Sequence, residues 1–278
     1  MVQYLKIEFQ NISILTSEML IAQLSEIGFD GFEENEHVLK AFIRENNFDE
    51  DKVNTIAGKL DAFYIKSIIE ETNWNQLWES NFQPVIINDL LHKKPWVSIR
   101  AVFHKPMIEI EHEIIITPKM SFGTGHHATT SMMMQQMSGI DFEGKTVLDF
   151  GTGTGILSIL AEKLGASKII AVDYDEWSIE NAKENFQQNN CKKIKLIYAD
   201  TIIPVNKFDV ILANINKNVI LKNFPAMAEQ VALNGILLIS GLLAEDEKDI
   251  LHEVSKFPLT FNKTTAENNW ICLSFNHN

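Results

Sequence analysis

The stretch TVLDFGTGTGILSIL, residues 146–160, decides the fold. Its apolar half, which ends at Phe150, is typical of a buried parallel strand, and the residues from Ile156 to Leu164 have the apolar spacing of a packed helix. The three glycines between them allow positive φ angles and a close approach of the backbone to a ligand, while the helix N-terminus offers unpaired N–H groups. This arrangement predicts a nucleotide-type site.

A second strand adds a carboxylate beside this turn. The apolar run from Lys168 to Val172 ends at Asp173, 22 residues after Gly151 and therefore at the carboxyl end of the neighbouring strand. A carboxylate at that point can accept hydrogen bonds from both hydroxyls of a ribose. Ile156 stands where a dinucleotide-binding loop has its third glycine, so the loop suits an adenosine without a diphosphate better. S-adenosylmethionine fits that description.

The rest of this half alternates strands and helices, with further strands at 194–198, 208–213 and 235–240 and two closing strands at 259–263 and 269–275. This order predicts an α/β fold, a mostly parallel sheet with an antiparallel edge. Ligands of such sheets bind at the carboxyl ends of the strands, where Gly151, Asp173, Asp200 and Asn214 lie. We expect one pocket there, with Asp200 near the adenine amino group and Asn214 beside the reactive methyl group.

Asn214 cannot be a general base, but its amide oxygen can accept a hydrogen bond from an incoming amine and aim the nitrogen lone pair. Nitrogen is therefore the favoured acceptor. A lysine, whose reference pKa is about 10.4, must first lose a proton, and the sequence identifies no acid or base for that step.

The first part of the chain predicts a smaller domain. Residues 1–72 have a β-α-β-β-α-β pattern, which resembles the ferredoxin-like α+β unit, and the first helix is expected to open at Thr16 or Ser17, with Ser17 as its cap. Residues 73–84 predict an amphipathic linker helix with Trp74 and Trp78 on one face. Residues 85–278 then form the catalytic domain and begin with strands at 96–102 and 108–116.

Composition restricts the partners. The chain has 278 residues, a formal charge of −13 and 45% hydrophobic residues, which fits a soluble globular protein and a basic protein substrate rather than a nucleic acid. Its two cysteines have neither disulfide nor zinc spacing. No signal peptide or apolar stretch long enough to span a membrane is evident, so we expect a cytoplasmic protein.

The stretch MSFGTGHHATT, residues 120–130, combines a glycine-rich loop with the start of a helix. Thr129 or Thr130 is expected at or just inside that start, and the methionines that follow are expected to fill core space. His126 and His127 are adjacent, so they point in different directions, and no third ligand is evident. We therefore expect no metal site.

These motifs carry a family resemblance. FGTG at 122–125, His127, the threonine pair at 129–130, and DFG-x-G-x-G from Asp149 resemble the methyltransferases of ribosomal protein L11, the PrmA type. Trp74, Trp78 and the Phe82-x-Pro84 pattern match the linker of that family, and Ala213-Asn214-Ile215 matches its segment after the fourth strand. The resemblance is clear from residue 74 to 241.

The resemblance implies a seven-stranded Rossmann-like class I methyltransferase domain and an N-terminal domain that recognises the substrate. It also implies S-adenosylmethionine as methyl donor, and lysine side chains and the N-terminal amine of ribosomal protein L11 as acceptors. The implied cofactor contacts are Thr130, Gly151, Asp173 and Asn214. We expect a monomer that binds neither membranes nor nucleic acid directly.

The chain departs from the family pattern at four places. His126, Ala128 and Lys119 replace residues that the family usually has, and Asn216-Lys217 follow Asn214-Ile215 where Leu-Ala is common. The last departure borders the acceptor site. It bears on which amines are methylated, and how often, more than on the reaction.

Other functions fit the residues less well. The acceptor could be another protein, a small amine or a nucleobase, although nucleobase amino methyltransferases of this fold usually carry Pro-Pro-Tyr or Pro-Pro-Phe where Asn214 is followed by Ile215-Asn216. A nicotinamide-dependent oxidoreductase is disfavoured by Ile156. A module that only binds the ribosomal protein would predict a disrupted glycine loop, and this loop is intact.

Overall fold

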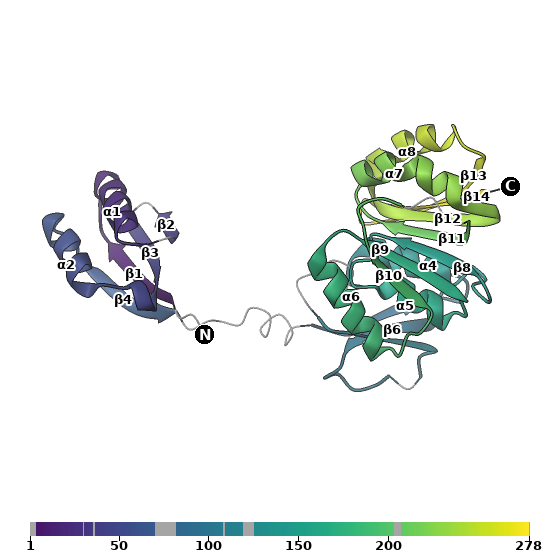
Figure 1. Cartoon of the computed structure of the whole chain (residues 1–278), viewed down its shortest axis with the longest axis horizontal. Helices are drawn as coiled ribbons and strands as arrows, with labels where there is room; N and C mark the ends of the chain where they lie inside the picture. The colour runs from purple at the N-terminus through teal and green to yellow at the C-terminus, as the bar shows by residue number, and fades with distance from the viewer. Residues whose placement is uncertain are drawn as a thin grey trace. The chain divides into compact units, whose positions relative to one another are not determined.

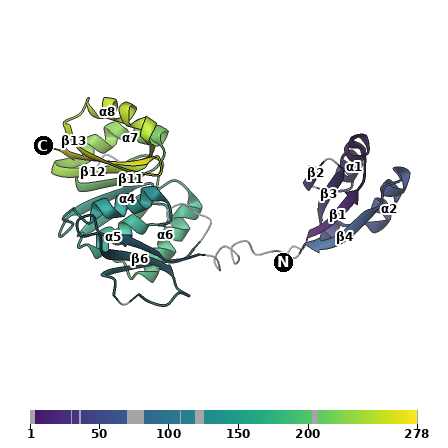
Figure 2. The ribbon, with the colours of Figure 1, turned by 180° about the vertical axis from the view of Figure 1, so that it is seen from behind.

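The computed structural model describes residues 4–29, 31–35, 37–69, 82–107, 109–118, 125–202 and 207–277. The chain divides between residues 80 and 81 into two compact units, and each has its own hydrophobic core (Figures 1 and 2). Most of the expected linker helix, including Trp74 and Trp78, lies outside the described residues, as do Lys119 and residues 122–124 of the FGTG motif.

The N-terminal unit is a four-stranded antiparallel sheet with the strand order β2-β3-β1-β4 and two helices. The inward side chains of the sheet, such as Ile7, Phe9 and Leu39, pack with apolar residues of the helices in one buried cluster. The elements of this unit are β1 (Tyr4–Gln10), α1 (Ile14–Glu26), β2 (Gly31–Asn35), β3 (Val38–Arg44), the 3-10 helix η1 (Glu45–Asn47), α2 (Glu50–Lys59) and β4 (Tyr64–Ile69).

The predicted start of the first helix is wrong by one turn. α1 begins at Ile14, and its cap is Ser13, whose Oγ accepts a hydrogen bond of 3.1 Å from the backbone N–H of Thr16. Ser17 lies inside the helix with its side chain buried. Both serines precede apolar residues at helical spacing, so the pattern alone did not separate the true cap from a serine one turn later.

The second unit contains a seven-stranded sheet in the order β10-β9-β8-β11-β12-β14-β13. The strands from β10 to β12 are parallel, whereas β14 runs antiparallel to both β12 and β13. The predicted α/β class with a mixed sheet is therefore confirmed. The elements are β8 (Thr146–Phe150), α5 (Ile156–Lys163), β9 (Lys168–Asp173), α6 (Glu176–Gln188), β10 (Ile194–Tyr198), β11 (Phe208–Asn214), α7 (Lys217–Gln230), β12 (Val231–Leu243), η2 (Ala244–Asp246), α8 (Glu247–Val254), β13 (Leu259–Glu267) and β14 (Trp270–His277).

Helices cover both faces of this sheet (Figure 1). Helices α4 (Ala128–Met137), α5 and α6 form one layer, and α7 and α8 form the other. The alternation along β8 fits this arrangement, because Leu148 and Phe150 belong to the cluster around α7, whereas Asp149 bonds to α5. The methionines of α4 (132, 133, 134 and 137) are fully buried, which confirms the expected core role.

A three-stranded sheet packs on α4, α5 and α6. It consists of β5 (Val85–Asn88), β6 (Pro95–Ala101) and β7 (His112–Ile116), and β6 and β7 are parallel. The strand predicted at 108–116 is shorter than expected and begins at His112, because the Ile110 N–H donates to the Met107 carbonyl in a turn that precedes the strand. In the described part of the chain, no helix is long and apolar enough to cross a membrane.

Candidate functional site

The glycine loop connects β8 to α5. Gly151, Gly153 and Gly155 have φ angles of 75°, 55° and 81°, a region that side chains rarely adopt. The backbone N–H groups of Gly151 and Thr152 donate to the carbonyl of Val172 over 2.8 and 2.9 Å, so the loop is tied to the end of β9. Gly155 is the cap of α5. The sequence therefore located both the turn and the helix that follows it.

Asp149, in β8, holds the glycine loop through hydrogen bonds of its side chain. It is fully buried, and its Oδ2 accepts hydrogen bonds from Thr152 Oγ1 at 2.6 Å and from Ser158 Oγ at 2.7 Å. Its Oδ1 has no hydrogen-bond partner among the described residues. Burial raises the pKa of this carboxyl to about 6, against the opposing effect of the two hydroxyl donors.

Asp173 lies at the carboxyl end of β9, as predicted. Its Oδ2 accepts a hydrogen bond of 2.8 Å from the N–H of Gly153, and its Oδ1 accepts one of 3.0 Å from the N–H of Asp175. The side chain is thereby fixed against the glycine loop. Each oxygen keeps a second lone pair, so two hydroxyl groups of a ligand have acceptors here.

Asn214 ends β11, and its amide nitrogen Nδ2 donates to Thr130 Oγ1 over 3.3 Å. Thr130 lies in the first turn of α4 and is buried. Since the amide nitrogen makes this bond, Oδ1 is the atom of Asn214 that can accept a hydrogen bond from an amine. The structure thus brings together two residues that are 84 positions apart and that the resemblance placed in one site.

The residue after Asn214 joins it to the glycine loop. A Cβ on Gly151 would lie 2.2 Å from Ile215 Cγ2, and a Cβ on Gly241 would lie 2.3 Å from the Ile215 carbonyl oxygen. The Ile215 N–H also donates to the carbonyl of Ser240. Thr130, Gly151 and Asn214 are therefore neighbours, and Asp173 is bonded to the same loop two residues farther on.

The two adjacent histidines have different surroundings, as their sequence positions predicted. The ring of His127 is 4.7 Å from that of Trp270, and its Nδ1 lies 2.8 Å from Thr129 Oγ1 and caps α4. The ring of His126 is 4.8 Å from that of Phe82. No group of three or more potential metal-binding side chains occurs among the residues that the structure describes.

Asp200 lies two residues beyond β10, the outermost strand on its side of the sheet, and its side chain is exposed. Tyr198, the last residue of β10, pairs with Asp173 of β9. Asp200 therefore follows the end of the strand next to Asp173. No bond links it to the four predicted cofactor contacts among the described residues, so its expected role toward adenine stays a prediction.

One residue of the site was missed in the sequence. Asn185 of α6 donates from Nδ2 to the carbonyl of Thr154 in the glycine loop over 2.8 Å, and it is fully buried. The available signal was the spacing of Asn181, Asn185 and Asn189, which places three amides on one face of a helix next to the loop.

Sequence comparisons agree with the motifs. A model of the ribosomal protein L11 methyltransferase family (PrmA) matches residues 8–278. A ribosomal protein L11 methyltransferase of Porphyromonas gingivalis is 39% identical over 269 residues, covering 93% of this chain and 90% of the relative. A ribosomal protein L11 methyltransferase of Chlorobaculum tepidum is 36% identical, and the match covers 91% of this chain and 90% of that relative.

A solved structure is similar as well. The crystal structure of a ribosomal protein L11 methylase from Lactobacillus delbrueckii subsp. bulgaricus matches with a TM-score of 0.62 and 26% sequence identity. The match covers 69% of this chain and 99% of that one.

Proposed function

Because this chain belongs to the family of ribosomal protein L11 methyltransferases, we propose that it transfers methyl groups from S-adenosylmethionine to amino groups of ribosomal protein L11. The family membership confirms the identification from the sequence motifs. The acceptors we propose are lysine side chains and the N-terminal amine.

One observation carries the proposal. Thr130, Gly151, Asp173 and Asn214 come from four separate parts of the sequence, and they meet at the carboxyl ends of β8, β9 and β11. This edge is where ligands of open α/β sheets bind. The residues that would hold the donor therefore lie beside the amide that would orient the acceptor.

The carboxyl groups at the glycine loop fit S-adenosylmethionine better than a dinucleotide. Asp173 offers two oxygens to vicinal hydroxyls, and the buried Asp149 carboxyl beneath the same loop has an oxygen without a partner among the described residues. Two carboxyl groups at one loop favour a ligand with positive charge and hydroxyl groups and disfavour a diphosphate. Thr130, Gly151, Asp173 and Asn214 are the residues we expect to hold the cofactor.

The bound cofactor supplies an activated methyl group, so the protein has to position the acceptor and keep water out. Asn214 Oδ1 can accept a hydrogen bond from the incoming amine and direct its lone pair. The bond from Asn214 to the buried Thr130 fixes the amide plane, and thereby the direction of that oxygen.

We propose that residues 85–278 form the catalytic domain, a seven-stranded Rossmann-like class I domain, and that residues 1–72 form a ferredoxin-like domain that recognises the substrate. The strand orders of the two units support this division. Residues 1–69 carry 12 acidic and 6 basic side chains, which suits a basic partner. Phe63, Ile65 and Ile68, at the edge strand β4, are more than half exposed and offer apolar contact area.

A panel of acceptors tests the proposal. The chain would be incubated with methyl-labelled S-adenosylmethionine and, in separate reactions, ribosomal protein L11, ribosomal RNA, free lysine and an unrelated basic protein. The proposal predicts label in L11 alone. Label in RNA or free lysine, with none in L11, would contradict L11 as the substrate. It would still support methyl transfer from S-adenosylmethionine as the reaction.

A further inference from the structure

The C-terminal half of α6 is attached to two other parts of the second unit through side-chain amides. Asn181, Asn185 and Asn189 share one face of the helix, and the first two are fully buried. Buried amides are costly unless they are hydrogen-bonded, so their partners show what this face holds in place.

Asn185 joins the glycine loop to the end of β7 through one amide group. Its Nδ2 donates to the carbonyl of Thr154 over 2.8 Å and to Asn181 Oδ1 over 3.1 Å. Its Oδ1 accepts a hydrogen bond of 2.8 Å from the N–H of Thr117. Both hydrogens of the amide nitrogen and the oxygen are therefore used, which fixes the side chain in one orientation.

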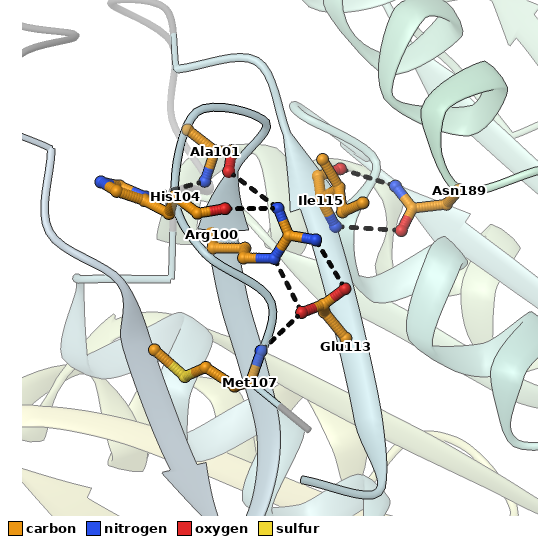
Figure 3. A network of polar contacts seen from close by, with 7 residues as sticks. All are labelled: Arg100, Ala101, His104, Met107, Glu113, Ile115 and Asn189. Carbon is orange, nitrogen blue, oxygen red and sulfur yellow. Dashed lines mark hydrogen bonds and ion pairs between the residues drawn. The ribbon is translucent and has the colours of Figure 1, made fainter. Parts of the chain in front are cut away.

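Asn189 holds the same strand one turn of helix later, without touching the loop. Its Oδ1 accepts a bond of 3.0 Å from the Ile115 N–H, and its Nδ2 donates over 2.6 Å to the Ile115 carbonyl (Figure 3). On the other side of β7, Arg100 makes two bonds of 2.7 and 2.8 Å to Glu113. β7 is thus held between β6 and α6, and Asn185 extends this attachment to the glycine loop.

We infer that Asn185 is a positioning residue for cofactor binding, which holds the Thr154 carbonyl and so keeps the loop from Gly151 to Gly155 in its binding conformation. The inference rests on the proposed function. Asn185 is fully buried and bonds to the backbone of the loop, so it acts on the cofactor through the loop. Its second bond ties the loop to Thr117, which precedes the proposed cofactor contact Thr130 by 13 residues.

Two variants separate this role from a general role in stability. Asn185→Asp keeps the acceptor for Thr117 but places an oxygen where Nδ2 donates, so it breaks the bond to the Thr154 carbonyl and the bond within α6 to Asn181, while β7 stays attached. Asn189→Ala is the matched control, since it removes the two bonds to Ile115 and the bond of 2.8 Å to the backbone carbonyl of Asn185, and leaves the side-chain bond from Asn185 to the loop intact. Both variants should lower the melting temperature.

Only the Asn185 variant should lose cofactor affinity. Titration calorimetry with S-adenosylmethionine should show a dissociation constant at least about tenfold higher for Asn185→Asp, which corresponds to about 1.4 kcal/mol, and a change below about twofold for Asn189→Ala. Equal affinity of Asn185→Asp and wild type for S-adenosylmethionine would overturn the inference about Asn185 and leave the proposed function in place. A wild-type chain that binds no S-adenosylmethionine would overturn the proposed function and the inference with it.

A measurement on the wild type keeps the inference testable if the buried aspartate prevents folding. Hydrogen exchange would be measured with and without S-adenosylmethionine. The ligand should slow the exchange of the backbone amides of the loop and of the Thr117 amide together, because Asn185 joins the two segments. Slowing in the loop with Thr117 unchanged would contradict the role of Asn185.

Discussion

Replacing Gly151 with alanine tests the contact that joins Asn214 to the cofactor loop. Gly151 has a φ of 75°, and a Cβ there would lie 2.2 Å from Ile215 Cγ2. Gly151→Ala therefore introduces two separate costs, backbone strain and steric overlap with the residue after Asn214.

A second glycine measures the strain by itself. Gly144 has a φ of 70°, and a Cβ on it would meet nothing within 4 Å. Gly144→Ala should lower the free energy of unfolding by about 1–2 kcal/mol through strain. Gly151→Ala should lower it by a further ~1–3 kcal/mol because the Ile215 side chain must move. That movement should shift Asn214 and slow methyl transfer at saturating cofactor by about tenfold or more, whereas Gly144→Ala should leave the rate nearly unchanged.

Urea unfolding and single-turnover methyl transfer would measure the two effects. The double variant Gly151→Ala/Ile215→Ala removes the overlapping atom, so its loss of stability should be smaller than the sum of the two single losses. Equal losses for the two glycine variants, together with an additive double variant, would refute the contact between the loop and Ile215.

Three further predictions concern the carboxyl and amide groups of the site. Asp173→Ala should raise the dissociation constant for S-adenosylmethionine at least about tenfold in calorimetry, because two ligand hydroxyls lose a charged acceptor. Asn214→Ala should mainly lower the single-turnover rate on L11, because the incoming amine loses the hydrogen-bond acceptor that orients its lone pair. Asp149 has its pKa raised from 3.8 to about 6, so the stability it contributes is complete below pH 4 and is lost as the pH rises through 6. In urea unfolding between pH 4 and 7, Asp149→Asn should therefore gain up to about 3 kcal/mol relative to wild type.

Each of these predictions has a clear contrary result. Unchanged cofactor affinity in Asp173→Ala would remove Asp173 from the site. An undiminished single-turnover rate in Asn214→Ala would refute the aiming role. A stability difference between Asp149→Asn and wild type that stays constant from pH 4 to pH 7 would show that this carboxyl does not titrate as its burial requires.

The residues at the strand ends were predictable because their spacing follows from the fold. Gly151 and Asp173 stand at the ends of two apolar runs, and parallel strands bring such ends to one edge of the sheet. Asn214 follows from the same rule. Thr130 does not, because it precedes β8 and lies on a helix; only the family motif indicated it, and the bond to Asn214 now gives its physical reason.

Other features depended on tertiary contacts that no local pattern encodes. Asn185 has the spacing of a helix face, but two of its partners are backbone groups outside α6, 31 and 68 residues away in the sequence. Likewise β12 extends over Val231–Leu243, well beyond the apolar run at 235–240, because β11 and β14 pair with it on both sides. The turn between β13 and β14 is local, with Asn268 and Asn269 at positive φ. The predicted end of the first closing strand at residue 263 is nevertheless four residues too early, because β13 pairs with β14 as far as Glu267 and Trp270.

The measurement that tests the central claim most directly is intact-mass spectrometry of ribosomal protein L11 from the same organism, incubated with this protein and S-adenosylmethionine. The account predicts mass increments in whole methyl units, which fragmentation assigns to lysine side chains or to the N-terminus. An unchanged mass, with binding of S-adenosylmethionine shown separately for the same preparation, would contradict the proposed substrate.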